Sequence, residues 1–186
     1  MATKVSLRQF QQDLAQRLSS AKDAPASTAR LGVLCGGSHW LIDLEDAGEI
    51  VPVPELTPVP LTKPWFLGVA NIRGSLFSVA DFSAFSGQGA TIRSGDNRLV
   101  LAGARFGVNA ALLVSRMLGL RNPREFEAAA AGVAESGPAA AWAGQRWTEG
   151  GNAGGSTSET RMGIREWREL KVGQLVEDPD FLNVGV

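Results

Sequence analysis

A nearly continuous apolar stretch, WFLGVANIRGSLFSVADF at residues 65–82, is interrupted in its middle by Arg73 and Gly74. The stretch is not a membrane span, because an arginine at the centre of a membrane helix costs roughly 2.5 to 3.5 kcal/mol and Asn71 adds a further polar group. Gly74 permits the positive φ of a tight turn, and Gly68 indicates a bulge or a close approach of another backbone. The sequence therefore predicts two apolar strands joined at Arg73 and Gly74.

The sequence around this stretch is also typical of short strands. RLGVLCGG at 30–37 and HWLIDL at 39–44 predict a hairpin that turns through the glycines and serine between them. The segment 51–64 carries five prolines, which lack the donor that a sheet ladder needs, so we expect an extended connection or an edge. NRLVLAGARFGVNAALLVSRMLGL at 97–120 predicts two further strands divided at 103–107. Short strands at this regular spacing favour a barrel or a sandwich.

The first residues predict an amphipathic helix at 1–22. Ser6 is suited to cap it, and Gln9 stands at the third position of a capping box. Apolar residues then recur every three or four positions along one face: Leu7, Phe10, Leu14 and Leu18. This stripe requires a partner surface, either on the chain's own domain or on another protein. Residues 23–30 are small and polar and include a proline, so we expect a linker there, followed by one domain over 31–186.

The C-terminal third predicts short helices and two more strands. NPREFEAAAAGVAE at 122–135 opens with an asparagine suited to capping and a proline at the first helical position, which predicts a short helix. Strands bearing tryptophan are expected around 142–147 and 164–170, separated by a loop rich in glycine and serine. The tail predicts a short helix and a turn that begins at Asp178 and Pro179.

Candidate catalytic residues are few. His39 is the single histidine and Cys35 the single cysteine, which leaves too few ligands for most metal sites and one base at most for a nucleophile. We interpret His39 as a turn or strand-end residue and Cys35 as a small buried residue. Glu45, Asp46 and Glu49 form an acidic group that fits either acid–base chemistry or a solvated face. We expect no catalytic residue, no metal site and no cofactor.

The charge balance argues against several partner classes. The chain of 186 residues has 18 basic and 19 acidic side chains, a formal net charge of −1. Its lysines and arginines form no run of the kind that binds nucleic acid or anionic lipid. We therefore expect no nucleic acid partner and no direct membrane insertion. The N-terminus does not read as a secretory signal, and the lone cysteine is typical of a reducing compartment, so the sequence indicates a cytoplasmic protein.

Interaction chemistry is better represented than catalysis, chiefly at Arg73. An arginine at a turn between apolar strands is either a structural charge tethered by a carboxylate or an exposed recognition group, and the two roles are compatible. GVANIRGSLFSVADF at 68–82 resembles the signature of the CheW family of chemotaxis coupling proteins, in which Gly-Val-x-Asn-Leu-Arg-Gly precedes a hydrophobic strand and Val-Asp-Leu. Residues 33–50 are similar to that family's first hairpin, and 97–120 to a strand pair in its second half.

Two departures and one narrower likeness accompany this resemblance. The family usually has a proline where Ser78 stands and an aspartate where Ser115 stands. The expected N-terminal helix and the ending REWREL…VGQLVEDPDFLNV are similar to the variant that serves type IV pilus chemosensory systems and twitching motility.

The resemblance implies a mainly β fold with two SH3-like five-stranded β-barrels on a shared hydrophobic core, plus the N-terminal helix and short extra helices. It implies a non-enzymatic adaptor, recruited to membrane-associated receptor arrays. Such an adaptor binds the cytoplasmic tip of a methyl-accepting chemoreceptor and the regulatory domain of a CheA-type histidine kinase. The alternative from another class is a regulatory β-barrel that binds a small molecule.

The resemblance also implies partner-binding positions. Carried over by motif, they are Glu49, Gly68, Asn71, Arg73, Gly74, Leu99 and Val100. Glu49 and Arg73 correspond to the receptor-facing groove, whose lining includes Leu99 and Val100, and Gly68 corresponds to the kinase contact. We expect Arg73 to close the hairpin turn and to pair with Glu49.

Overall fold

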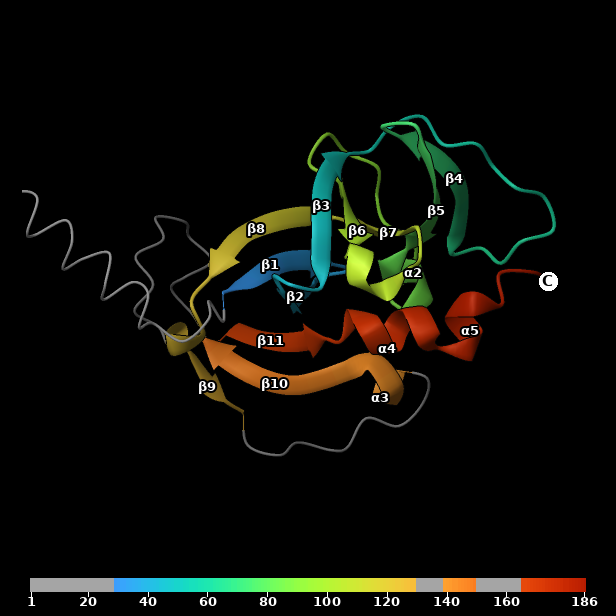
Figure 1. Ribbon diagram of the computed structural model, residues 1–186. Coiled ribbons are helices and arrows are strands. Elements are labelled where there is room, and N and C mark those ends of the chain that lie inside the picture. Colours follow the sequence, from blue (N-terminus) through green and yellow to red (C-terminus); the bar gives the residue numbers. More distant parts are fainter. Residues whose placement is uncertain (1–28, 130–138, 150–164) are drawn as a thin grey trace, which may run out of the picture.

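The computed structural model describes residues 29–129, 139–149 and 165–186. The expected helix at 1–22, nearly all of the linker at 23–30 and the loop rich in glycine and serine lie outside these residues. Within them, the chain forms two β-sheets accompanied by short helices (Figure 1).

The first sheet has six strands in the order β8-β1-β2-β11-β10-β9. Its strands are β1 (Arg30–Cys35), β2 (Ser38–Asp43), β8 (Arg116–Arg121), β9 (Phe126–Ala128), β10 (Ala143–Glu149) and β11 (Arg165–Leu170). β1 and β2 pair as an antiparallel hairpin whose turn residues Gly36 and Gly37 have φ values of 55° and 85°. The hairpin predicted from the sequence is confirmed.

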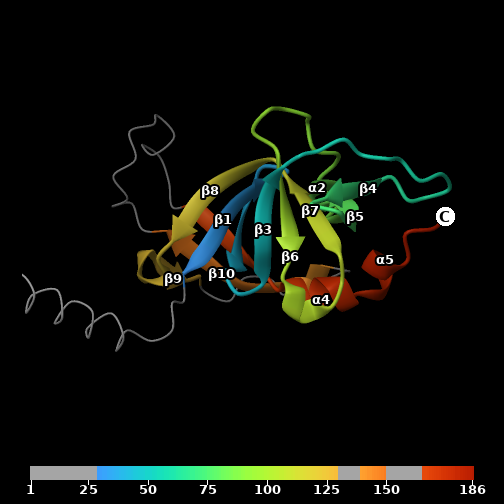
Figure 2. The same cartoon turned by 45° about the horizontal axis from the view of Figure 1, so that its top comes forward.

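The second sheet has five strands in the order β3-β6-β7-β5-β4 (Figure 2). Its strands are β3 (Ala47–Pro52), β4 (Phe66–Ile72), β5 (Ser75–Asp81), β6 (Arg98–Ala102) and β7 (Ala110–Val114). β3 is an edge strand, and the proline-rich chain that follows it adds only two isolated bridges, from Thr57 to Val69 and from Thr62 to Gly185. The prediction that prolines keep this segment out of the centre of a sheet is confirmed.

The helices in the described ranges are all short. They are α2 (Phe82–Phe85), η1 (Ala104–Phe106), η2 (Pro123–Glu125), α3 (Ala139–Trp142), α4 (Val172–Glu177) and α5 (Pro179–Leu182). Asp178 caps α5 as expected, its Oδ1 accepting a hydrogen bond from Asp180 N at 2.8 Å. In the described part of the chain, no helix is long and apolar enough to cross a membrane.

In the C-terminal third, one sequence expectation is corrected and another is confirmed with one residue changed. Asn122 caps only the single 3₁₀ turn η2, through a hydrogen bond from Arg124 N at 3.1 Å. The chain then extends as β9 because Phe126 is buried against Trp167, with ring centroids 5.5 Å apart. The two strands expected around 142–147 and 164–170 are confirmed as β10 and β11, although Trp142 itself ends helix α3 and β10 begins at the next residue.

The buried side chains of the described residues form three groups, one of which joins the two sheets. The largest, called here the shared core, receives residues from both sheets and from the C-terminal helices. At its centre Trp40, Phe82 and Trp142 contact one another with ring centroids 5.1 to 5.7 Å apart. Each sheet also has its own smaller cluster, around Leu113 in the five-stranded sheet and around Trp167 in the six-stranded one. Because side chains alternate along a strand, each sheet contributes to two of these clusters.

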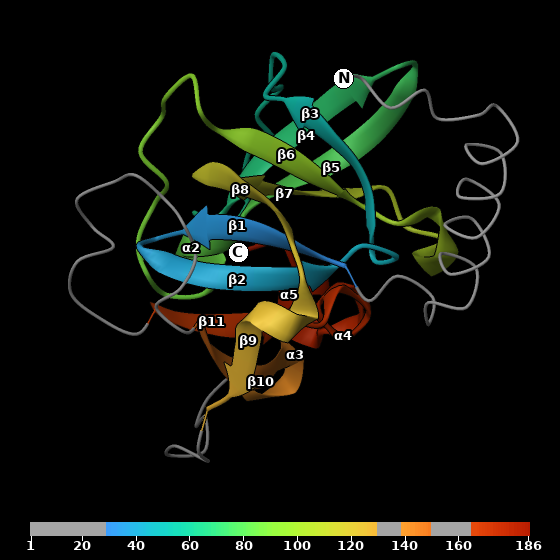
Figure 3. The ribbon, with the colours of Figure 1, turned by 90° about the vertical axis from the view of Figure 1, so that its left-hand side faces the viewer.

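This arrangement is the mainly β fold expected, with two sheets (Figure 3) that share a core of buried side chains. The six-stranded sheet has one strand more than expected, because the short strand β9 pairs with β10 at its edge.

Candidate functional site

The turn between β4 and β5 presents Arg73 at the surface. Arg73 and Gly74 have φ values of 52° and 85°, which are those of a two-residue type I′ hairpin turn. Asn71 closes the turn by accepting a hydrogen bond from Gly74 N at 2.9 Å on its Oδ1. The turn predicted from the sequence is confirmed. A non-glycine residue in this left-handed region costs roughly 1–2 kcal/mol, since its Cβ crowds the following carbonyl oxygen, so Arg73 occupies a position that suits asparagine or glycine better.

Arg73 is joined to Glu49 by a salt bridge, as expected. The Arg73 Nη2 lies 2.6 Å from Glu49 Oε1, and the two side chains are 78% and 38% exposed. Glu49 belongs to β3 and Arg73 follows β4, which are the two edge strands of the five-stranded sheet. The sheet therefore curls until its two edges are linked by one ion pair. A pair this exposed contributes roughly 0–1 kcal/mol to stability.

Gly68 lies beneath the proline-rich segment. It has a φ of 114° at a shift in the β4–β5 register, and a Cβ there would collide with the carbonyl oxygen of Thr57. Thr57 and Val69 exchange backbone hydrogen bonds of 2.8 and 2.9 Å beside it. Both sequence interpretations of Gly68, the bulge and the close backbone approach, are confirmed. Because Gly68 is buried, a partner at this place would touch the covering residues Thr57 and Pro58 instead.

Leu99 and Val100 require a correction. They are neighbours on β6 and therefore point to opposite faces of the sheet. Leu99 packs in the cluster of the five-stranded sheet, Val100 in the shared core, and both are at most 2% exposed. The structure gives neither side chain a surface in a groove open to a partner, so both support the site from beneath.

The acidic group in the sequence divides between two arginines. Glu49 pairs with Arg73, whereas Glu45 and the buried Asp46 pair with Arg105, with 3.5 Å from Arg105 Nη1 to Glu45 Oε2. These carboxylates are therefore ion-pair partners of arginines in the described structure. The sequence did not identify Arg105 as the partner of Glu45 and Asp46. Its one distinguishing feature there is its place in the break at 103–107, which has a glycine at each end.

Asp81 was also missed, although it lies in the family motif. Its side chain is 2% exposed, and its carboxylate accepts hydrogen bonds from Ser83 N, Ala84 N, Thr91 N and Thr91 Oγ1 at 2.7 to 3.3 Å. Asp81 thereby caps α2 and fastens the chain around Thr91 to the end of β5. The signal that could have identified it is an aspartate that ends an apolar strand and precedes a helical turn.

The candidate nucleophile and base both take structural positions. Cys35 is fully buried, and burial raises the pKa of its thiol far above the ordinary range, which is the opposite of what a reactive thiolate needs. His39 lies on β2 with its ring centroid 5.0 Å from that of Trp167. Among the described residues, no three histidine, cysteine, aspartate or glutamate side chains are grouped to hold a metal ion.

The surface around the ion pair is the exposed edge of the five-stranded sheet. Asn71 and Gly74 are exposed at the hairpin turn, while the exposed Ile50 follows Glu49 on β3 and therefore points to the other face of that strand. The site therefore combines an exposed arginine, joined to a carboxylate, with the free edge of a sheet. Such an edge offers a partner backbone and side-chain contacts together.

Comparison with known proteins supports the same family. Residues 30–145 match the CheW-like domain. Protein PilI of Pseudomonas aeruginosa is 31% identical over 110 residues, which are 59% of this chain and 61% of PilI. The chain thus matches somewhat less than two thirds of that relative's length.

A solved structure has the same fold. The crystal structure of the scaffolding protein TtCheW from Thermoanaerobacter tengcongensis superimposes with a TM-score of 0.57 at 17% identity, covering 78% of this chain and 90% of TtCheW. Since the family match covers more than half of the chain and includes the Glu49–Arg73 pair, the chain belongs to the CheW-like family.

Proposed function

We propose that this chain is a non-enzymatic adaptor that places a CheA-type histidine kinase under the control of a methyl-accepting chemoreceptor. Membership of the CheW-like family supports this role, as does a likeness to a protein described as a scaffold. The likeness to PilI favours a chemosensory pathway that controls type IV pili and twitching motility. The adaptor would act in the cytoplasm, at receptor arrays attached to the membrane.

The observation that carries the proposal is the conformation of Arg73. The chain keeps an arginine where the backbone favours glycine or asparagine, and holds it toward Glu49 by an exposed salt bridge. Backbone strain that does not add to the stability of the fold is typical of residues that serve a function. An exposed ion pair returns too little free energy to offset that strain on its own.

We assign the receptor to the side of the Glu49–Arg73 pair. There the pair fixes the β3 edge against the β4–β5 turn, and Asn71 and Gly74 keep that turn in shape. A receptor helix would lie along this edge, beside the exposed turn. The kinase regulatory domain would contact the chain that covers Gly68, at Thr57 and Pro58.

The test is titration calorimetry of the wild type and Arg73→Glu against a receptor cytoplasmic tip and, separately, a CheA-type regulatory domain. The charge reversal places two acids together at the pair, so we expect receptor binding to weaken about tenfold or more, roughly 1.4 kcal/mol. Kinase binding should change little. Arg93→Glu, which reverses an exposed arginine in the loop before β6, is the matched control and should leave both affinities unchanged.

Circular dichroism melting distinguishes a binding defect from unfolding. The melting temperature of Arg73→Glu should stay close to that of the wild type, because the pair is exposed. Flat titrations of the wild type with both cognate partners would contradict the adaptor role.

A further inference from the structure

An apolar groove lies on the part of the molecule that carries the C-terminus. It has a volume of about 400 Å³ and opens between the β4–β5 hairpin, the chain before β7 and helices α4 and α5. Its largest apolar lining residues are Trp65, Phe66, Leu76, Phe181, Leu182 and Val184, and none of the described residues lining it is charged. A groove of this size is within the range that binding sites occupy, about 300–1,000 Å³.

The rim of this groove is apolar and exposed. Leu76 and Leu182 are each 60% exposed, and Leu61 and Val186 nearby are 81% and 84% exposed. Val186 N donates a hydrogen bond to Leu61 O at 3.2 Å, so the last residues are fastened to the rim. Several large apolar side chains gathered on one face mark a surface that another element covers.

The chain itself contains a segment of matching chemistry. The stripe predicted on residues 1–22, namely Leu7, Phe10, Leu14 and Leu18, requires an apolar surface. We infer that this stripe docks in the groove of the same molecule. The groove is neutral, so it selects an occupant by apolar contact and shape rather than by charge.

The linker is long enough to allow this docking. Arg30 is on β1 and Leu170 is on β11, with β2 between these two strands. The two residues are therefore about 10 Å apart across the sheet and offset by one residue along it. Two residues and one helical turn from Leu170 reach Val176 in the groove lining, adding at most about 13 Å. Residues 19–29 reach roughly 36 Å when extended.

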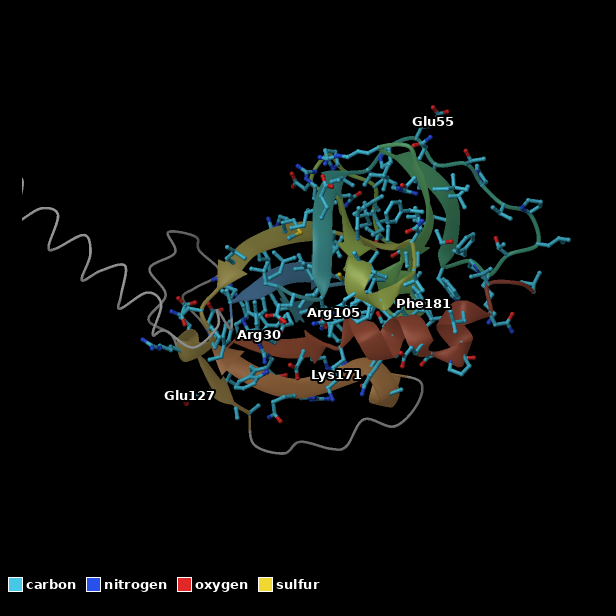
Figure 4. The ribbon with its side chains drawn as sticks, in the orientation of Figure 1. Arg30, Glu55, Arg105, Glu127, Lys171 and Phe181 are labelled. Atoms are coloured by element: carbon cyan, nitrogen blue, oxygen red, sulfur yellow. The ribbon has the colours of Figure 1, made fainter. Side chains whose placement is uncertain are left out.

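The side-chain view agrees with this path. Figure 4 shows Arg30 at the start of β1, Phe181 on α5, and Lys171 between them at the end of β11. A tether of only about eleven residues also holds the segment near the groove at a millimolar effective concentration, which favours the chain's own stripe over that of a second copy. A partner that uses this face would have to displace the segment first.

Paramagnetic relaxation enhancement on the full chain tests the inference. On the helix predicted for residues 1–22, a nitroxide attached to Gln12→Cys would lie opposite the stripe. The buried Cys35, with its raised thiol pKa, stays unlabelled. We expect broadening of the backbone amides of Leu76, Asn109 and Leu182. The effect should disappear in Leu14→Asp and persist in Gln16→Asp, which places the same acid on the outward side.

Two results would overturn the inference. One is that the amides of the groove are not broadened, or that the broadened amides lie on another surface, such as the one around Leu120 of β8. The other is equal broadening in a mixture of nitroxide-labelled chains without ¹⁵N and ¹⁵N-labelled chains without nitroxide, which would mean that the occupant comes from a second copy. Because no partner protein is added, either result can be separated from a failure of the adaptor proposal.

Discussion

The two ends of strand β5 hold charged groups in opposite ways. At its start, Arg73 stands exposed in a strained turn and makes one salt bridge to Glu49. At its end, Asp81 is buried and accepts four hydrogen bonds from α2 and the chain around Thr91. A buried carboxylate whose donors would otherwise be unsatisfied stabilises the fold, whereas an exposed pair contributes little stability. One motif therefore carries stability at one end and, in our proposal, function at the other.

The largest expected effect is at the buried end. Asp81→Ala removes the acceptor of four hydrogen bonds, so we expect the free energy of unfolding to fall by about 3 kcal/mol. Urea denaturation measures this as a lower midpoint. Asp96→Ala, an exposed aspartate in the following loop, is the control and should change stability by no more than about 0.5 kcal/mol. Equal losses in the two variants would show that Asp81 has no special place in the fold.

Two glycines of the same hairpin give an intermediate effect. Gly68→Ala forces a Cβ into the carbonyl oxygen of Thr57, so we expect a loss of at least about 2 kcal/mol and release of the proline-rich segment. Gly74→Ala has open space and meets only the left-handed φ, which costs about 1–2 kcal/mol. Hydrogen exchange at Val69, which donates to Thr57 O, should rise far more in the first variant. The same exchange rate in both would contradict the close packing at Gly68.

The smallest stability effect is expected at the exposed end, and in the opposite direction. Arg73→Asn replaces the strained arginine by a residue that favours this turn, so the free energy of unfolding should rise by about 0.5 kcal/mol. Receptor binding should nevertheless weaken, because the salt bridge to Glu49 is lost. Denaturation and titration of one preparation test both expectations. A variant that binds as well as the wild type would remove the functional reason for the arginine.

The sequence predicted local geometry better than side-chain environments. Arg73 and Gly74 between two apolar runs identified the hairpin turn, because only a few residue types suit a positive φ. The ion-pair partner of Arg73 could not be predicted in this local way, because Glu49 lies 24 positions earlier in the sequence. Only the family resemblance suggested that the two residues meet. No local rule connects residues on opposite edges of a curled sheet.

Burial was the harder property to predict. Leu99 and Val100 match positions assigned to a groove, yet neighbouring residues of a strand enter two separate cores. The residues before Phe126 have the pattern of a helix start, yet Phe126 itself lies in the extended strand β9, where it packs against Trp167. In both places tertiary packing decided what a local pattern left open.

The most direct test of the account is a charge-swap cycle at the ion pair, measured by titration against the receptor tip. Glu49→Arg and Arg73→Glu should each weaken binding about tenfold, roughly 1.4 kcal/mol, because like charges would push the β3 edge and the turn apart. The double variant restores an opposite pair, and we predict that it regains most of the lost affinity. Binding by the double variant that is as weak as by Arg73→Glu alone would contradict the claim that the pair acts by fixing this edge.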